Sequence, residues 1–371
     1  MESRVLSAAF LVVALTAVTA CDSSGDGKHT ASARPSSTAP RMRQNSVVGV
    51  VGTSPGTKAV GTPSTARVVG LGYEFHLLGT ATPPVVSTDH GPRQAAAGQR
   101  LLLVRYDATG SLGRQSDLDT PGLTKRATLV VDGTRTVLSP DALPSGHDET
   151  VAMSVAENAH DLSLEIETGD LVQSLSLVTG ERSGADPVVL YRTDAENQDA
   201  TGFPSVTAEI SKRLSFPFAL ISSNGQQDTF PDGKYPTTID VEKAHLTYTL
   251  TQPDNELRVP SSPDKAFLTL DTQVTGGNSW MTALPTKDFV LTTDKGQKVP
   301  AQRFDDPGLR TGDLQDSDNA FFGGKVYWEV PGDTKSATLT ITATKNHHMG
   351  GLFNSSMLDY HNKRQSLDIP F

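Results

Sequence analysis

The chain has 371 residues, a length that suits two domains of ordinary size better than one small sandwich. Its 32 glycines, 23 prolines and low aromatic content of 6%, without long amphipathic helical patterns, favour short strands joined by turns. The 42 acidic residues outnumber the 32 basic ones, and the net charge of −10 argues against nucleic-acid binding, which needs a basic face. The composition therefore predicts an all-β protein that does not bind nucleic acid.

Residues 1–20 have the pattern of an export signal peptide. Arg4 precedes the apolar run Ala8–Val18, which is too short to span a bilayer. The next residues, Val18-Thr19-Ala20-Cys21, resemble the lipobox of bacterial lipoproteins. That resemblance implies cleavage before Cys21, acylation of its sulfur and a lipid anchor on the extracytoplasmic face of the cell membrane. The alternative is an ordinary secretory signal followed by a chance cysteine.

Cys21 is the only cysteine of the chain, and it stands at the one position where lipidation requires it. The remaining sequence can form no disulfide and offers no thiol nucleophile or thiolate metal ligand. The sequence thus predicts lipidation as the one role for a cysteine here.

Residues 21–66 form a segment rich in Ser, Thr, Pro, Gly and Ala. Such a composition buries too little apolar surface to offset its ordering entropy, so we expect a flexible tether. The segment and its boundary are also basic, which favours added contact with anionic lipid, although a plain solvated linker explains the charge equally well. The basic residues are Lys28, Arg34, Arg41, Arg43, Lys58 and Arg67.

Five strands are predicted in the first half of the remaining chain. The first is Gln99–Asp107, and the hairpin Ala127–Val131 and Arg135–Leu138 follows, joined by an Asp-Gly pair that suits a tight turn. Val151–Val155 and Leu162–Ile166 then form a closing pair.

The second half repeats this order of strands. Its members are Asp264–Val274, the hairpin Phe289–Thr293 and Lys298–Ala301, and the closing pair Val326–Val330 and Ala337–Ile341.

The closing pairs give the clearest match between the halves. Val155 and Val330, Leu164 and Leu339, and Ile166 and Ile341 are all separated by 175 residues. Alternation of apolar and polar residues predicts strands with one buried and one wet face, as in a sandwich. We therefore predict two tandem immunoglobulin-like β-sandwiches, over residues 67–195 and 204–371, with an acidic junction at 194–199.

The order of strand, hairpin and V-x-x-x-V, turn, L-x-L-x-I resembles the telokin-like, immunoglobulin-like secreted domains of actinobacteria and other Gram-positive bacteria. These include the family of the mycobacterial immunoprotective extracellular protein. The second copy, with Glu329-Val330-Pro331 before its last pair, fits this pattern better than the first. The resemblance implies an extracytoplasmic adhesion or binding module without established enzymatic activity, and it supplies no functional residues.

Three strings resemble catalytic motifs, but each lacks its required context. Gly52–Gly56 matches a nucleophile elbow, yet it lies in the predicted tether and Pro55 removes a backbone N–H. Ser262–Lys265 matches S-x-x-K but leads into a strand instead of opening a helix, and Ser317–Asn319 matches S-D-N without a K-T-G after it. We therefore predict that the protein is not an enzyme.

Two groups of residues offer metal ligands. The acidic loop 305–319 carries carboxylates without the spacing of a calcium-binding EF-hand loop, so we favour a solvated loop. His347-His348, with Asp359 and His361, could bind zinc or copper, but adjacent histidines of a strand point to opposite faces. No metal and no cofactor are predicted.

Several aromatic residues suit either a binding patch or the packing of the sandwiches, and we favour packing. Trp328 is in strand phase with Val326 and Val330 and is predicted to lie in the core. The others are Trp280, the Phe321-Phe322 pair, and Phe203, Phe216 and Phe218.

The sequence as a whole predicts a cell-surface lipoprotein that acts as a non-catalytic binding or adhesion module. Its partners would be the membrane, through Cys21, and an unidentified protein or envelope component. Two alternatives remain: an envelope carrier of a small ligand or metal, and a passive structural spacer.

Overall fold

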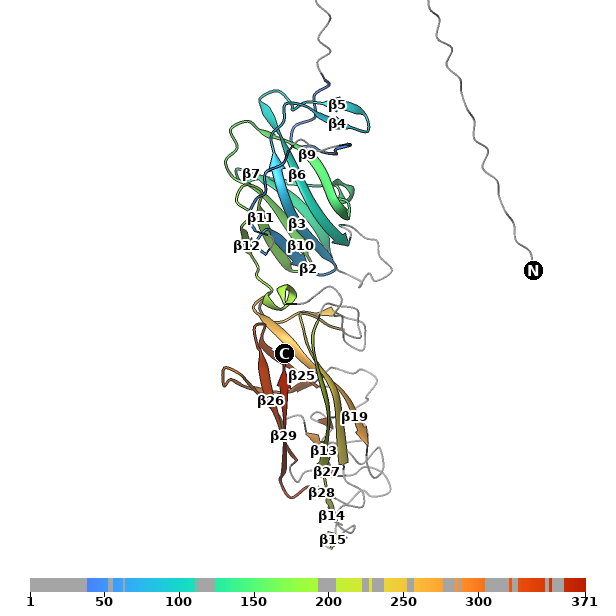
Figure 1. The fold of residues 1–371 in the computed structure, drawn as a ribbon. Helices are drawn as coiled ribbons and strands as arrows, with labels where there is room; N and C mark the ends of the chain where they lie inside the picture. Colours follow the sequence, from blue (N-terminus) through green and yellow to red (C-terminus); the bar gives the residue numbers. More distant parts are fainter. Residues whose placement is uncertain are drawn as a thin grey trace, which may run out of the picture. The chain divides into compact units, whose positions relative to one another are not determined.

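The computed structural model describes most of the chain from residue 39 onward, and there it is an all-β protein built of antiparallel sheets, as the composition predicts (Figure 1). No α-helix occurs in this part, and the two 3-10 helices, η1 (Pro140–Ala142) and η2 (Val188–Tyr191), are short. No helix within it could cross a membrane. The described residues are 39–52, 56–62, 64–110, 112, 124–192, 205–221, 227–228, 237–251, 257–275, 284–285, 288–303, 320–321, 326–343, 347–348 and 357–371.

The first sandwich consists of two five-stranded sheets. In spatial order, one contains β1 (Val47–Gly49), β9 (Gly146–Ala156), β6 (Gln99–Gly110), β3 (Tyr73–Ala81) and β2 (Arg67–Gly70). The other contains β12 (Arg182–Gly184), β11 (Leu171–Ser176), β10 (Leu162–Thr168), β7 (Lys125–Val131) and β8 (Thr134–Val137). Side chains of both sheets form one buried cluster, in which the rings of Phe75 and Tyr106 stack with their centroids 4.8 Å apart.

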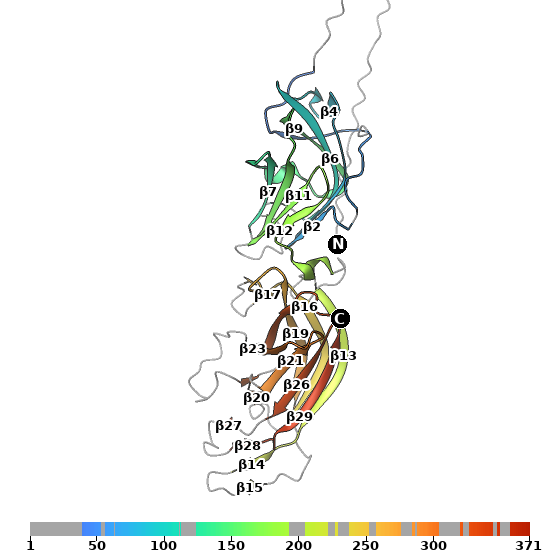
Figure 2. The same ribbon diagram turned by 90° about the vertical axis from the view of Figure 1, so that its left-hand side faces the viewer.

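The second sandwich pairs a five-stranded with a four-stranded sheet (Figure 2). The former contains β13 (Ser205–Phe216), β16 (Thr237–Thr247), β19 (Lys265–Thr275), β25 (Val326–Pro331) and β23 (Gln302–Arg303). The latter contains β22 (Lys298–Pro300), β21 (Phe289–Thr293), β26 (Ser336–Ala343) and β29 (Lys363–Pro370).

Smaller sheets complete the described fold. They are β4 (Val86–Thr88) with β5 (Gly91–Arg93), β17 (Leu250–Thr251) with β18 (Leu257–Arg258), β20 (Leu284–Pro285) with β24 (Ala320–Phe321), and β15 (Gln227–Asp228), β14 (Ala219–Ile221), β28 (Met357–Asp359) and β27 (His347–His348).

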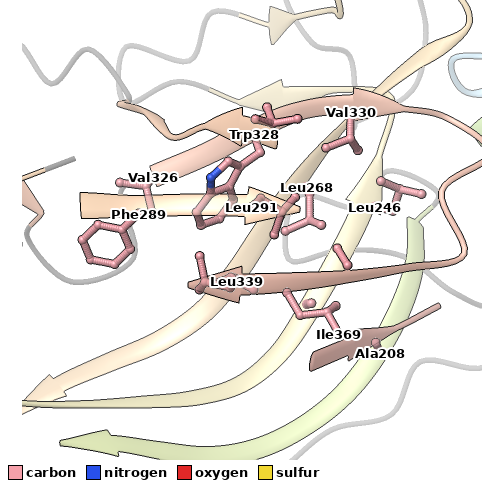
Figure 3. Close-up of a cluster of buried hydrophobic side chains, with 14 of the residues drawn as sticks. Ala208, Leu246, Leu268, Phe289, Leu291, Val326, Trp328, Val330, Leu339 and Ile369 are labelled. Carbon is pink, nitrogen blue, oxygen red and sulfur yellow. The ribbon is translucent and has the colours of Figure 1, made fainter. Parts of the chain in front are cut away.

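The core of the second sandwich lies between its two large sheets. Figure 3 shows Trp328 and Leu268 from one sheet facing Leu291 and Leu339 from the other. The Trp328 side chain is fully buried, so the prediction that it belongs to the core is confirmed. Apolar side chains that alternate along β26 supply the facing layer, and this alternation is the pattern that the sequence displays.

The two sandwiches share one topology, so the predicted strand repeat is present in the structure. The order β9-β6-β3-β2 corresponds to β25-β19-β16-β13, and β11-β10-β7-β8 corresponds to β29-β26-β21-β22. Equivalent residues also face each other in register across the strands. Leu102 lies opposite Met153 as Leu268 lies opposite Trp328, and Leu129 lies opposite Leu164 as Leu291 lies opposite Leu339.

The predicted tether differs from the structure in its second half. Residues 47–49 form β1, which pairs with β9, and Lys58 forms a bridge with Thr80. Met42 is only 7% exposed, and Ala66 is fully buried. Composition misses this because a few apolar residues in a polar segment are enough when a sheet edge provides backbone partners. Residues 1–38, with the predicted signal peptide, lie outside the described part.

The expectation of one wet face is wrong for β9, and the neighbouring strand β6 is also buried on both faces. All residues from Val151 to Val155 are buried, as are Leu101 to Val104 on the neighbouring strand. Leu101, Leu103 and Ala152 point away from the inter-sheet core and form a second buried cluster. Residues 42–50 and the β4–β5 region cover this face with the side chains Met42, Val48, Val50, Val86 and Ala95.

The second sandwich has the same feature at equivalent positions. Phe267 and Tyr327 occupy the outer face of β19 and β25, where they contact each other edge to face with ring centroids 5.5 Å apart. The β17–β18 hairpin supplies Leu250 as a cover, and Arg258 donates a hydrogen bond to the Tyr327 hydroxyl. Each copy therefore has an apolar patch on the outer face of two equivalent strands, β6 and β9 in the first and β19 and β25 in the second. A different segment covers the patch in each copy.

Residues 39–371 form one compact unit, and the segment around η2 has hydrogen-bond partners before and after it in the chain. The Tyr191 hydroxyl accepts a hydrogen bond from the Val69 N–H at 3.1 Å, and Arg192 Nη1 donates to the carbonyls of Gly332 and Thr334 at 2.8 and 2.6 Å. Val189 and Leu190 are buried in the hydrophobic cluster that includes the second sandwich.

Truncating Met42 tests whether this segment belongs to the fold. We expect Met42→Ala to lower the free energy of unfolding by about 2 kcal/mol, because it removes a buried side chain from the outer cluster. Val51→Ala is the control, since Val51 is 48% exposed, and we expect it to change this free energy by less than about 0.5 kcal/mol. Urea denaturation measures both; an equal, negligible effect would show that residues 42–50 do not pack on the sheet.

Candidate functional site

A pocket of about 430 Å³ lies between the segment 41–49 and the β4–β5 hairpin of the first sandwich. This volume is within the range of sites that hold small organic ligands. Half of its ten lining residues are exposed, and the pocket is open to solvent. The lining comprises Arg41, Met42, Arg43, Ser46, Val48, Gly49, Thr88, Asp89, His90 and Arg93.

Backbone hydrogen bonds hold the segment 41–49 against the sheet. The Met42 N–H donates to the Gln94 carbonyl at 2.8 Å, and the Gln94 N–H donates to the Pro40 carbonyl at 3.1 Å. The Ser154 N–H donates to the Ser46 carbonyl at 3.1 Å, and the Asn45 N–H donates to the Ser154 carbonyl at 3.0 Å. One wall of the pocket is therefore built on the β9 edge and on the residues after β5.

The β4–β5 hairpin forms the opposite wall. The Thr88 hydroxyl donates to the Gly91 carbonyl at 2.8 Å and accepts from the His90 N–H at 3.2 Å. Gly91 has a φ of +89°, a conformation that favours glycine and that allows this tight turn. These bonds fix the turn at whose tip Asp89 and His90 are exposed.

The pocket is electropositive although the protein is acidic. Three arginines and one aspartate line it, which gives a formal charge of +2 with His90 neutral, in a chain whose net charge is −10. Within the described chain, Arg41, Arg43 and Arg93 form no ion pair. Met42 and Val48 add an apolar part to the lining. This combination can bind an anion that carries a small organic group.

The S-x-x-K string does not form a serine–lysine pair. Ser262 donates its hydroxyl hydrogen bond to Asp264, whereas Lys265 Nζ donates to the neighbouring Ser261 Oγ at 2.8 Å and lies 3.2 Å from Glu329 Oε1. The string lies in a turn, where the Lys265 N–H bonds to the Ser262 carbonyl, and β19 begins at Lys265. Ser317–Asn319 lies outside the described residues, as does 53–55 of the elbow string.

Glu329 is the acceptor at the centre of this small network. Partial burial opposes its ionisation, but hydrogen bonds from the hydroxyl and the backbone N–H of Ser261, together with Lys265, outweigh burial and lower its pKa. The arrangement ties the loop before β19 to β25, which is a structural role.

The network predicts a difference between two adjacent serines. Because the folded-state pKa of Glu329 is lowered, its contribution to stability is present above the ordinary carboxyl value of 4.5 and is lost as the pH falls through the lowered value. We expect Ser261→Ala to raise the pKa of Glu329 and Ser262→Ala to leave it unchanged. Carboxyl-carbon NMR titration measures both; a shift with Ser262→Ala instead would mean that Ser262 faces the network.

The candidate metal ligands do not form a described site. His347 and His348 lie in β27, opposite Leu358 and Met357, and the acidic loop is outside the described residues from 304 to 319. Asp359 accepts a hydrogen bond from the His361 N–H at 2.8 Å. Across the described residues, no group of three or more His, Cys, Asp or Glu side chains is placed to hold a metal ion.

The aromatic candidates are placed in part. Phe216 is buried in the core, and the Phe218 ring contacts the Tyr360 ring edge to face with centroids 5.6 Å apart. Both phenylalanines therefore pack within the second sandwich. The side chains of Trp280, Phe203, Phe321 and Phe322 lie outside what the structure describes, and so does Cys21.

A hydroxyl–imidazole–carboxylate chain is one feature that sequence reasoning missed. His245 Nδ1 is 3.1 Å from Thr207 Oγ1, and His245 Nε2 is 3.0 Å from Asp271 Oδ2. The order resembles a catalytic triad, but the three residues lie on adjacent strands, and His245 pairs with Thr207 on one side and Thr269 on the other. An oxyanion hole needs free backbone N–H donors, whereas these three residues lie within paired strands of one sheet. We therefore interpret the three side chains as a cross-strand polar ladder.

No protein-family model, curated protein or solved structure matches this chain. The resemblance to telokin-like secreted domains therefore stays a prediction from strand order. The arginine-lined pocket is the feature of the described residues that best fits a binding function.

Sequence reasoning missed the pocket because its walls are far apart in the chain. Arg41 and Arg43 belong to the segment interpreted as a tether, and Arg93 follows about fifty residues later. The excess of basic residues in that segment is the one signal of the pocket in the sequence, and lipid contact or solvation explains it equally well.

Proposed function

We propose that the protein is a lipid-anchored, extracytoplasmic binding module that acts without turnover and holds an envelope component in the arginine-lined pocket. The observation that carries this proposal is the pocket itself, a preformed concave site whose arginines, on two walls, form no ion pair with any described residue. The signal-like N-terminus and the lipobox-like Val18–Cys21 support the anchor.

The position of the pocket in the chain suits such a role. Arg41 follows Cys21 by twenty residues, and twenty residues span at most about 70 Å when fully extended. A lipid on Cys21 would keep the pocket within that distance of the membrane surface. The pocket would then meet components of the inner part of the envelope.

An envelope carrier of a small ligand is a second candidate, and the pocket volume favours it. The two functions differ in whether the bound component is part of a larger partner. A crosslinking experiment separates them, because a macromolecular partner gives an adduct of higher mass.

Replacing Cys21 tests the anchor. We expect Cys21→Ala to move the protein from the membrane fraction to the soluble fraction and to abolish incorporation of labelled palmitate, because no other thiol can be acylated. Ser23→Ala is the matched control and should leave both properties unchanged. Membrane retention with label in the Cys21→Ala chain would contradict lipidation at this residue.

A photocrosslinking residue at Asp89 tests the binding site. We expect a specific adduct in the intact envelope, because Asp89 is exposed at the tip of the hairpin beside the pocket. The matched control carries the same group at Val137, which is 60% exposed on β8 of the other sheet. Equal adducts at both positions, or none at Asp89, would contradict a partner at this pocket.

Binding without turnover has its own test. A hydrolytic activity of the protein that is lost in Ser262→Ala would contradict it.

A further inference from the structure

We propose that the ligand of this pocket is a phosphate ester, recognised by Arg41, Arg43 and Arg93. The inference rests on the proposed function, since it names the chemical class that the binding module holds. It concerns the phosphate group itself, which a soluble ester or a lipid headgroup can supply.

The first argument is the contrast between these arginines and others of the same sandwich. Four strand arginines there are paired with carboxylates, in the pairs Arg67–Glu74, Arg105–Asp148, Arg126–Glu167 and Arg135–Glu165, and Arg100 donates to the Ala159 carbonyl. The three pocket arginines have no such partner in the described chain, although acidic residues exceed basic ones in the sequence. Gathering like charges at one pocket is unfavourable unless an anion compensates them.

The second argument is the geometry of the guanidinium group. Each arginine offers a planar fork of N–H donors that binds two oxygens at once. A carboxylate has only two oxygens, and one or two forks satisfy it, whereas a phosphate ester presents more oxygens in a tetrahedral arrangement. Three arginines on two walls suit the tetrahedral group better.

The third argument is the size and the remaining lining of the pocket. A volume of about 430 Å³ exceeds what a bare anion needs, so the phosphate would carry an organic group. Met42 and Val48 offer that group apolar contact, and the Asp89 carboxylate offers an acceptor for its hydroxyls. The hydroxyls of Ser46 and Thr88 donate to backbone carbonyls, so the arginines and the His90 ring N–H remain as the side-chain donors for the anion.

Calorimetry with glycerol 3-phosphate tests this inference on the Cys21→Ala chain, which cannot be lipidated. We expect saturable binding that weakens about tenfold in Arg41→Gln and in Arg93→Gln, because each removes a charged hydrogen-bond donor. Arg364→Gln is the matched control, since Arg364 is exposed on β29 and its loss changes the net charge equally. Unchanged melting temperatures show that the variants fold, and Arg43→Gln replaces Arg93→Gln if the latter perturbs β5.

Cosedimentation with phosphatidylglycerol vesicles, against phosphatidylcholine vesicles, identifies the source of the phosphate. Arginine-dependent binding to these vesicles alone assigns a lipid headgroup, and binding to glycerol 3-phosphate alone assigns a soluble ester. The inference is overturned if neither binds, if acetate competes as well as inorganic phosphate, or if Arg364→Gln weakens binding as much as the pocket variants. An Asp89 adduct that persists in such a case would leave the binding module standing with a different ligand.

Discussion

The cover over the outer face of β6 and β9 is the interaction on which the first sandwich and its pocket depend. Leu101, Leu103 and Ala152 would expose apolar surface on a sheet whose other face already forms the inter-sheet core. Residues 42–50 and the β4–β5 region bury that surface, and β1 extends the sheet by pairing with β9. Because burial of apolar side chains drives this packing, the segment is held in place although its composition is that of a linker.

The pocket is a consequence of that cover. Met42 anchors one wall by its buried side chain, and the neighbours Arg41 and Arg43 remain exposed beside it. The hairpin that contributes Val86 to the same apolar cluster also carries Arg93 into the lining. Residues 42–50 with their neighbour Arg41, and the β4–β5 hairpin, thus supply both the apolar side chains that pack on the sheet and the arginines that line the pocket. A binding site built in this way requires no change to the sandwich core.

The duplicated topology shows where the two copies diverged in structure. Leu101 and Ala152 correspond to Phe267 and Tyr327, and in both copies these outer positions are apolar and covered. The second copy uses the β17–β18 hairpin and the Arg258–Tyr327 hydrogen bond, which leaves that arginine engaged within the fold. The first copy uses residues 42–50 and the β4–β5 region, and the pocket arginines Arg41, Arg43 and Arg93 beside this cover form no ion pair in the described structure. The shared core therefore carries different surfaces.

The sequence by itself determined the all-β class, five strands in each half and their repeat, because a period of two along strands such as β10 and β26 is a local property of the chain. It missed other strands of the large sheets, among them β3, β13 and β16. It also identified Trp328 as a core residue from its phase with Val326 and Val330. Only the tertiary structure decided that Met42 packs on β6 and β9, that Lys265 pairs with Glu329 and not with Ser262, and that Arg41 and Arg93 line one pocket. These are contacts between residues distant in the chain or between side-chain rotamers, and no local pattern encodes which of many equivalent polar residues meet in space.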